Sequence, residues 1–243
     1  MTSEVERQRS YYRSTAPQYD DAHAELEHVH ALHLLGAYVE LNDVRSILDI
    51  GAGTGRAMLW LRERFPGLVI KGVEPVDELR EIGHSKGLSR EDLLPGDGAN
   101  LSFADNSFDL VCEFAVLHHV RRPGQVVAEM SRVARRMVAI SDCNFMGQGP
   151  KGVRAVKSLL YLLGLWRAAD WVKTRGKGYT ISEGDGLAYS YSIFQDVGRL
   201  RHSWRNIRLI TTGGDADGPF GLMRSAAHLL VVASGKKVPV LPD

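Results

Sequence analysis

The sequence contains very little cysteine: only Cys112 and Cys143 occur among its 243 residues. Two cysteines cannot build a disulfide scaffold or a cysteine-based zinc site, and this composition fits a reducing, cytoplasmic setting. Long apolar runs are also missing, so no membrane-spanning helix is expected. The first ten residues, MTSEVERQRS, are polar, so we expect no signal or transit peptide.

An excess of charge of one sign is missing as well. Lys and Arg number 30 and Asp and Glu number 29, which gives a formal net charge of +1. A general polyelectrolyte match to nucleic acid is therefore not indicated, and no DNA partner is expected. Hydrophobic residues make up 44% and charged residues 24%, values that exclude a disordered or fibrous chain.

Short apolar runs alternate with amphipathic stretches over residues 44–143, which is the pattern of repeated strand–helix units. Such alternation predicts an α/β fold with a parallel sheet and helices on both of its faces. The expected strands are 46–50, 68–73, 92–97, 108–114 and 137–141, and the expected helices are 56–64, 77–86 and 123–135.

The C-terminal part of the chain is less regular. Apolar residues at helical spacing predict a helix over 153–166, and a second helix is expected over 191–204. Residues 207–212 and 227–234 are both typical of strands, and the glycine-rich segment 213–221 between them is typical of a loop. Two strands in direct succession should pair antiparallel.

The segment Ile47–Gly55, with the sequence ILDIGAGTG, is the most informative motif. A glycine-rich turn after a buried strand lies at the carboxyl edge of a parallel sheet, and its backbone can approach a ligand closely. Gly51, Gly53 and Gly55 form G-x-G-x-G, whereas dinucleotide sites need G-x-G-x-x-G and phosphate loops need Gly-Lys-Ser/Thr. The turn therefore favours a nucleoside ligand without a pyrophosphate, although a purely structural turn has the same composition.

Two acidic residues fit the same kind of site. Glu74 ends the second expected strand about 20 residues after the glycines, where a carboxylate can bind ribose hydroxyls. Asp97 lies at the end of the third expected strand in a Gly-Asp-Gly-Ala segment, where it can accept a hydrogen bond from an exocyclic amine such as adenine N6. Each residue also has a plainer interpretation, a solvated carboxylate at a helix start for Glu74 and an ordinary turn aspartate for Asp97.

The segments ILDIGAGTG, GVEP, GDGANLSF and FDLVCEFAVLHHV, in this order and spacing, resemble the motifs of class I S-adenosylmethionine-dependent methyltransferases. The resemblance covers roughly residues 44–143. It implies a Rossmann-like, doubly wound, seven-stranded sheet that is mostly parallel with an antiparallel last strand, and it implies S-adenosyl-L-methionine as the cofactor. The segment YYRSTAPQYDD also resembles the aromatic lead-in that covers the cofactor in many small-molecule members.

The resemblance implies a role for each matching residue. The first motif would hold the methionine moiety, Glu74 the ribose and Asp97 the adenine, while the tyrosines either close over the cofactor or belong to a simple docking helix. The expected cofactor-binding residues are Tyr11, Tyr12, Tyr19, Asp49, Gly51, Ala52, Gly53, Gly55, Glu74, Pro75, Asp97, Gly98, Ala99, Glu113 and Phe114.

Two histidines, His118 and His119, follow the fourth expected strand at the ligand edge. Either can act as a general base toward a hydroxyl acceptor, and a structural role is an equally good interpretation. Transfer from a sulfonium needs no acid for the leaving group, so positioning of the reactants dominates. Asp142 and Asn144 follow the fifth strand, where they either orient an acceptor or form a turn.

No metal site is expected. Histidines cluster near the N-terminal end, where His30 and His33 are three residues apart on one helix face. No acidic or cysteine residues complete a recognisable ligand set there, so a polar helix face is the better interpretation.

Segment 151–178 is markedly basic, with an excess of six positive charges. It lies between the fifth and sixth strands, and an insertion at that place can cap an acceptor site. A cap over an anionic or sugar-like acceptor is the first interpretation. A peripheral membrane face, an RNA-facing patch and a core helix with a solvated basic side are the alternatives. Its charged residues are Lys151, Arg154, Lys157, Arg167, Lys173, Arg175 and Lys177 against Asp170.

These inferences divide the chain into an N-terminal helical lid (1–43), a cofactor-binding half (44–143), an insertion or acceptor cap (144–206) and a C-terminal hairpin that completes the sheet (207–243). The expected function is S-adenosylmethionine-dependent methylation of a small-molecule acceptor, with an oxygen of a sugar or secondary metabolite favoured because no Asn-Pro-Pro-Tyr element follows the fourth strand. A non-catalytic cofactor-binding or regulatory subunit and, with less support, an NAD-linked oxidoreductase are the alternatives. The oligomeric state stays open.

Overall fold

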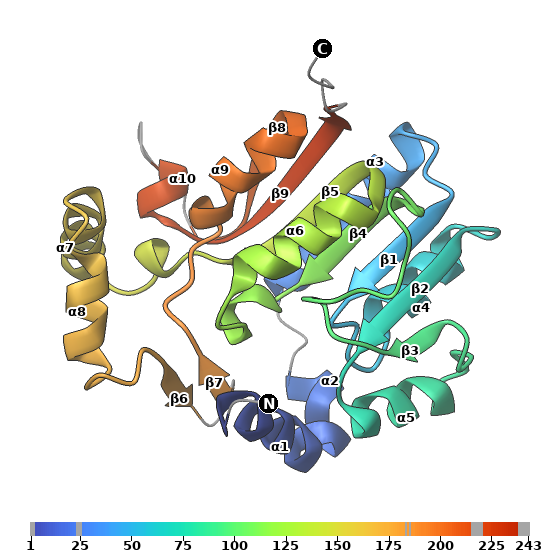
Figure 1. Cartoon of the computed structure of the whole chain (residues 1–243), viewed down its shortest axis with the longest axis horizontal. Coiled ribbons are helices and arrows are strands. Elements are labelled where there is room, and N and C mark those ends of the chain that lie inside the picture. Colours follow the sequence, from blue (N-terminus) through green and yellow to red (C-terminus); the bar gives the residue numbers. More distant parts are fainter. Residues whose placement is uncertain (1–2, 23–25, 183, 185, 215–220, 238–243) are drawn as a thin grey trace.

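A computed structural model describes residues 3–22, 26–182, 184, 186–214 and 221–237 (Figure 1). Its main sheet has seven strands in the order β3-β2-β1-β4-β5-β9-β8, and β6 pairs with β7 in a separate hairpin. The strands are β1 Ser46–Ile50, β2 Val69–Glu74, β3 Leu93–Pro95, β4 Phe108–Phe114, β5 Ala134–Cys143, β6 Thr180–Ser182, β7 Gly186–Ala188, β8 Trp204–Gly214 and β9 Ala226–Lys236.

Helices connect and cover these strands. The α-helices are α1 Ser3–Thr15, α2 Tyr19–Ala22, α3 Leu26–Leu41, α4 Arg56–Arg64, α5 Asp77–Ser85, α6 Pro123–Val133, α7 Lys151–Leu162, α8 Trp166–Lys173, α9 Phe194–Ser203 and α10 Gly221–Arg224. Single turns of 3-10 helix are η1 Ala16–Gln18, η2 Leu117–His119 and η3 Phe145–Gly147. Among the described helices we find none with the length and apolar character that a membrane crossing requires.

The strand directions confirm the predicted fold class. The strands from β1 to β5 are all parallel to one another, and β9 runs antiparallel to both β5 and β8. Because β1 lies between β2 and β4, the winding of the chain reverses at β1. Ligands of open α/β sheets bind outside the carboxyl ends of the strands at such a reversal, so the topology places the glycine-rich turn there.

The sheet is buried on both faces, as the continuous apolar runs predict. In β1 the adjacent residues Ile47 and Leu48 are both fully buried and belong to two different core clusters. One cluster includes Leu35 of α3, and the other includes Met130 of α6 and Leu200 of α9. Figure 1 shows α6 in front of the sheet and α3 behind it, so the layers are helix, sheet and helix.

The N-terminal region differs from the predicted single lid over residues 1–43. Leu35 and Val39 of α3 are buried in a core cluster with Ile47 of β1, so α3 is a covering helix of the sheet. The α1 and α2 helices instead lie at the carboxyl edge, as Figure 1 shows. The lid hypothesis therefore applies only to residues 3–22.

Two predicted helices were wrong in their bounds. The expected helix 153–166 is split into α7 and α8, because Gly164 has a φ of 70° and ends the first helix in the left-handed conformation. The expected helix 191–204 begins only at Phe194, since Ser192 forms a bridge with Asn144. The β6–β7 hairpin was not expected.

The C-terminal hairpin is longer than expected, because β8 begins at Trp204 and β9 ends at Lys236. Its antiparallel pairing confirms the prediction from direct succession. Most of the predicted loop 213–221 falls on residues 215–220, which lie outside the described residues, as does the end of the expected segment 207–243.

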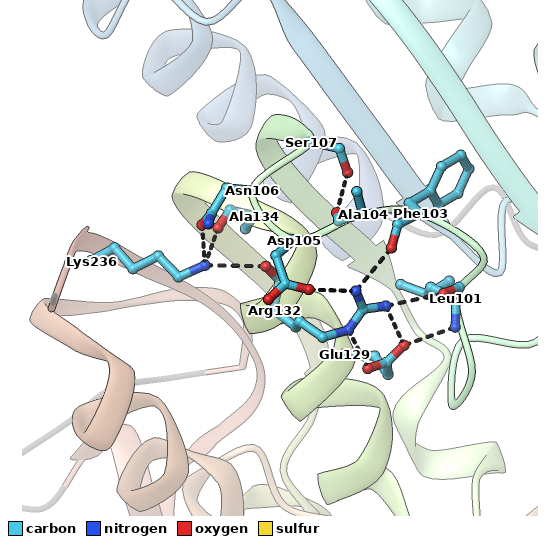
Figure 2. A network of polar contacts seen from close by, with 10 residues as sticks. All are labelled: Leu101, Phe103, Ala104, Asp105, Asn106, Ser107, Glu129, Arg132, Ala134 and Lys236. Carbon is cyan, nitrogen blue, oxygen red and sulfur yellow. Dashed lines mark hydrogen bonds and ion pairs between the residues drawn. The ribbon is translucent and has the colours of Figure 1, made fainter. Parts of the chain in front are cut away.

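A network around Arg132 of α6 holds the connection between β3 and β4 (Figure 2). The guanidinium donates to the carbonyls of Phe103 at 2.8 Å and Leu101 at 3.0 Å and pairs with Asp105 at 2.8 Å. Glu129 accepts from the same guanidinium and from the Leu101 amide at 2.8 Å. The loop that follows the Gly-Asp-Gly motif is thus anchored to a helix of the core.

Candidate functional site

A cavity of about 650 Å³ opens at the carboxyl edge of the sheet, between the ends of β1, β2 and β4 and helix α1. A smaller cavity of about 230 Å³ shares Tyr19, Gly51 and Phe114 with it. The two cavities bring together many of the residues that the sequence predicted. Tyr12, Tyr19, Gly51, Glu74, Pro75, Asp97, Ala99, Phe114 and His119 line the larger one, and Asp49 and Ala52 line the smaller one.

The glycine-rich turn after β1 folds tightly against the end of β2. The amides of Gly51 and Ala52 donate to the carbonyl of Val73 at 2.8 and 3.1 Å. Gly51 has a φ of 67°, and a Cβ there would lie 2.5 Å from Val116, so a larger residue is excluded. Gly53 has a φ of 55° and lies under the ring of Tyr19. The turn and Tyr19 therefore form one compact wall.

Glu74 connects this turn to the end of β2. One carboxylate oxygen accepts from the amide of Gly53 at 3.0 Å, and the other accepts from the amide of Val76 at 2.8 Å. Burial raises the pKa of Glu74 to about 7 although these two amides lower it. A carboxylate oxygen can accept more than one hydrogen bond, so the same oxygens retain capacity for a pair of hydroxyl groups in the cavity.

Asp49 is a buried carboxylate beside the smaller cavity, with only 2% of its surface exposed. Burial and the nearby charge of Glu74 raise the pKa of Asp49 to about 7, and the thiol of Cys112 lies 3.9 Å from it. A cation bound in this cavity would favour the ionised form of Asp49. The arrangement is suited to an ammonium or sulfonium group.

Asp97 forms a tight turn at the far end of the larger cavity. Its carboxylate accepts from the amide of Ala99 at 2.9 Å, and its carbonyl accepts from the amide of Asn100 at 2.9 Å. The buried apolar side chains of Val76 and Leu79 line the same cavity. Apolar walls with one carboxylate at the rim provide a slot that suits a nucleobase.

The three tyrosines of the N-terminal segment do not all face the site. Tyr12 and Tyr19 line the larger cavity, with ring centroids 5.8 Å apart. Tyr11 instead packs against Gly186 of β7 and lines a separate surface groove. Successive residues of a helix point about 100° apart, so Tyr11 and Tyr12 face different neighbours. The expectation that Tyr11 closes over the cofactor is corrected accordingly.

The strands and turns that form this site belong to a segment that is similar to known proteins. Residues 48–139, which span β1 to β5, match the family model described as a methyltransferase domain. Over these residues the chain is similar to a methyltransferase domain, and the match covers less than half of its length. An uncharacterized methyltransferase of Mycobacterium avium (strain 104) is 30% identical over 158 residues, which are 60% of this chain and 61% of that protein. The norajmaline N-methyltransferase of Rauvolfia serpentina is 32% identical over 95 residues, or 37% of this chain and 32% of that protein.

Solved structures share the fold over nearly the whole length. The magnesium protoporphyrin IX methyltransferase of Synechocystis PCC 6803 with bound S-adenosylmethionine has a TM-score of 0.62 and 14% identity, and the alignment covers 96% of this chain and 98% of that one. A possible histamine N-methyltransferase of Thermotoga maritima has a TM-score of 0.59 and 17% identity, with 93% and 98% covered. The curated relatives agree over a shorter part, since the chain spans about 61% of the length of the first of them.

Several of the predicted residues lie just behind the cavity walls. Gly55 starts α4 and packs against Leu88, and Gly98 packs against Ile50. Glu113 is fully buried and accepts from the amide of Val116 at 2.8 Å. Burial and the charge of Asp142 raise the pKa of Glu113. These residues shape the candidate site through its backbone and do not line it.

His118 belongs to a buried pair behind the larger cavity. Its Nδ1 lies 2.8 Å from a carboxylate oxygen of Asp142, whose other oxygen accepts from the amide of Leu117 at 2.8 Å. Burial raises the pKa of Asp142, but His118 and the hydrogen bond from the Cys143 amide hold that pKa at about 2. An ionised Asp142 fixes the hydrogen of His118 on Nδ1. His118 does not line the larger cavity, so of its two interpretations, a base or a structural residue, its position favours the structural one.

His119 is the histidine that lines the larger cavity. Its Nδ1 lies 2.7 Å from the carbonyl of Leu187, and Nε2 of Gln8 lies 3.2 Å from the same atom. A carbonyl can only accept, so the shorter contact places the hydrogen on Nδ1 and makes Nε2 the basic nitrogen. The ring lies 3.9 Å from that of His118, measured between centroids.

Sequence reasoning missed a set of polar cavity residues in α1 and after η2. Glu4 accepts from Arg121 at 3.0 Å and from the hydroxyl of Tyr189 at 3.2 Å, which connects three separate parts of the chain. The first ten residues are polar, but a polar composition does not say which residues face the cavity. The missed lining residues are Glu4, Gln8, Arg9, Arg121, Arg122 and Gln125.

Asn144 and a small cluster of potential metal ligands lie at the end of β5 and beside it. Asn144 is buried and accepts from the amide of Met146 and the hydroxyl of Ser192, so it shapes a turn. His118, Asp142 and Cys143 bring ligand atoms within 4.8 Å of one another in the described part of the chain. Asp142 already accepts hydrogen bonds from the His118 ring and the Cys143 amide, which accounts for this proximity without an ion.

Proposed function

We propose that this protein transfers a methyl group from S-adenosylmethionine to a small-molecule acceptor, at an oxygen of a sugar or secondary metabolite. The observation that carries the proposal is the cavity of about 650 Å³, which joins Gly51, Glu74 and Asp97 at the carboxyl edge. This volume lies within the range of small-molecule sites. The norajmaline N-methyltransferase among the relatives supports a small-molecule acceptor, although its name specifies nitrogen.

The cofactor would extend along the strand ends. Adenine would lie against Val76 and Leu79 with Asp97 at its rim, and the ribose hydroxyls would bind Glu74. The methionine end would then reach the glycine-rich turn and Asp49, where the carboxylate favours a positive charge. Tyr19, which lines both cavities, would lie beside the sulfonium.

The acceptor would occupy the part of the larger cavity between α1 and β7. The side chains of Glu4, His119, Arg121 and Tyr189 line this part, and their donors and acceptors suit a hydroxylated molecule. The acceptor oxygen would attack the methyl carbon, and the electron pair of the breaking carbon–sulfur bond would pass to sulfur. Nε2 of His119 would take the hydroxyl proton, an effect worth roughly 10²–10⁴-fold in rate.

Binding of the product S-adenosylhomocysteine tests the cofactor site. In titration calorimetry Glu74→Gln should weaken this binding at least about tenfold, because each lost hydrogen bond to a charged group is worth about 1.5–3 kcal/mol. Glu81→Gln is the matched control, since Glu81 is 58% exposed in its ion pair with Arg90. Absence of binding by the wild type, or NAD binding in its place, would refute the proposed site.

Transfer of a labelled methyl group to a metabolite extract tests the activity and the base. His119→Ala should lower kcat about 100-fold while S-adenosylhomocysteine affinity stays within about twofold. His202→Ala is the control, because His202 also contacts a backbone carbonyl but is exposed on α9. A protein that binds the cofactor product yet labels no acceptor would instead favour the regulatory-subunit alternative. Unchanged kcat in His119→Ala would eliminate the base.

A further inference from the structure

The α7 helix has its apolar side chains on the solvent side. Val153, Val156, Leu159 and Leu162 are 47%, 58%, 57% and 71% exposed. These positions follow a helical spacing of three residues, so they form one continuous stripe. A helix of a globular protein normally turns such a stripe toward the core, which was one of the alternatives that the sequence left open for this segment.

Polar side chains occupy the opposite side of α7, which packs on the protein. The ammonium of Lys157 donates to the carbonyls of Phe145 at 2.9 Å and Gln148 at 3.1 Å. Arg154 donates to the carbonyl of Ser225 at 3.4 Å, and Ser158 is only 3% exposed. These contacts fix the rotation of the helix, so the exposed stripe is a built feature of the fold.

The exposed apolar surface continues into the next segment. Leu163 and Leu165 connect α7 to α8 with 61% and 51% exposure, and Trp171 and Val172 of α8 are 64% and 69% exposed. Figure 1 shows α7 and α8 together at one side of the molecule, apart from the main sheet. We call this the α7–α8 surface, defined by Val153, Val156, Leu159, Leu162, Leu163, Leu165, Trp171 and Val172.

Positive charge surrounds the α7–α8 surface. Segment 151–178 carries seven Lys or Arg residues and one acidic residue, Asp170, which accepts from the hydroxyl of Ser190 at 2.5 Å. Lys151, Arg167 and Arg175 are exposed. Within the described residues, no ion pair to a carboxylate involves any of the seven basic side chains. Arg154 and Lys157 face the protein, and the other five basic residues are exposed, so the segment that carries this apolar surface is also cationic.

We propose that the α7–α8 surface docks on an anionic lipid membrane. Leucine, valine and tryptophan side chains would enter the boundary between headgroups and acyl chains, and the basic side chains would bind lipid phosphates. A second copy of the chain is a poorer occupant. A two-fold contact would set the same excess of six positive charges against itself.

Sedimentation with vesicles tests the apolar part of the surface. The wild type should bind vesicles of phosphatidylglycerol and phosphatidylcholine but not vesicles of phosphatidylcholine alone. Val156→Ser with Leu162→Ser should weaken binding at least about tenfold, because apolar contacts with the bilayer are lost. Val69→Ser with Leu41→Ser is a matched control, since these residues are 55% and 84% exposed elsewhere. The control should bind like the wild type.

A second pair of variants tests the contribution of positive charge to membrane binding. Arg167→Gln with Arg175→Gln should weaken binding to the anionic vesicles about 30-fold at low ionic strength, and added salt should weaken wild-type binding too. Arg205→Gln with Arg208→Gln removes the same net charge from exposed positions on β8 and should have little effect.

Tryptophan fluorescence shows which part of the chain enters the membrane. Trp171 is 64% exposed, whereas Trp204 is 1% exposed and Trp60 and Trp166 are half-buried. Anionic vesicles should shift the emission to shorter wavelength, and Trp171→Phe should remove most of this shift while the protein still sediments with the vesicles.

Three outcomes would overturn the proposal. The wild type would stay in the supernatant with anionic vesicles, or the paired Val156/Leu162 variant and its control would bind alike. In the third outcome the wild type would be a dimer in solution that the Val156→Ser and Leu162→Ser changes dissociate, which would assign the surface to a second copy. None of these measurements depends on methyl transfer, so they remain separate from the test of the proposed function.

Discussion

Asp49 and Glu74 lie buried at the rim of the cavities, and burial raises the pKa of each to about 7. An unfolded chain has carboxyl pKa values near 4, so between about pH 4 and pH 7 the folded protein binds more protons than the unfolded chain. The empty protein therefore loses stability as pH rises through this window. Above pH 7 the cost is fully present, and a bound cation would offset it.

The first prediction concerns Asp49→Asn, which removes one of these charges at constant shape. At pH 8 the unliganded variant should melt several degrees higher than the wild type, because one pKa unit corresponds to about 1.4 kcal/mol. At pH 4.5 the difference should nearly vanish. Thermal scans at both pH values measure this, and Glu63→Gln on the exposed side of α4 is the control. Equal melting temperatures at pH 8 would show that Asp49 is not strained by burial.

Asp142 shows the opposite behaviour at the same scale. His118 and the Cys143 amide hold its pKa at about 2 in spite of burial. Its contribution to stability is therefore present above the unfolded pKa near 4 and is lost as pH falls toward 2. Asp142 thus responds to pH in the opposite way to Asp49 and Glu74, because only Asp142 has a hydrogen-bonded imidazole partner.

At the scale of elements, the loop between β3 and β4 depends on α6. Arg132 donates to the carbonyls of Leu101 and Phe103, and its ion pairs with Glu129 and Asp105 raise its pKa. This loop directly follows the turn of Asp97, so its anchor also positions one end of the cavity. The network in Figure 2 thus supports the site, although none of the residues drawn there lines the larger cavity.

Arg132→Met should accordingly lower both stability and S-adenosylhomocysteine affinity. We expect a loss of about 2–3 kcal/mol in the free energy of unfolding and a roughly three- to tenfold weaker binding, since buried acceptors lose their donors. Arg136→Met is the matched control, because Arg136 donates to the carbonyls of Asn42 and Asp43 on the other side of the sheet. Denaturant unfolding and calorimetry separate the two effects. Affinity lost equally in both variants would contradict the positioning role.

At the scale of the whole molecule, α3 decides where the lid ends. Leu35 is fully buried among residues of β1, β2, β4 and α4, so α3 is part of the core. Leu35→Ala should cost about 2–5 kcal/mol in the free energy of unfolding, whereas Leu41→Ala, at 84% exposure, should change it by less than about 0.5 kcal/mol. Denaturant titration measures both. A similar loss of unfolding free energy in both variants would show that α3 is not part of the core and belongs to the lid.

The sequence alone determined the sheet and the turn at its edge. Alternating apolar runs define strands buried on both faces, and the G-x-G-x-G turn needs glycine because of its own backbone angles. Both signals are local, so the expected strand 108–114 agrees with β4 and the expected helix 56–64 agrees with α4. Glu74 and Asp97 were found for the same reason, because each ends or follows a recognisable strand.

Only the tertiary structure decided which side of each irregular element faces the cavity, the core or the solvent. It separated Tyr12 from Tyr11 and His119 from His118, and it turned the apolar side of α7 outward. A residue pattern reports that a helix has two faces, but the neighbours that the rest of the fold supplies determine which face is buried. For α7 those neighbours are backbone carbonyls, which bind Lys157 and Arg154 and leave the apolar stripe in water.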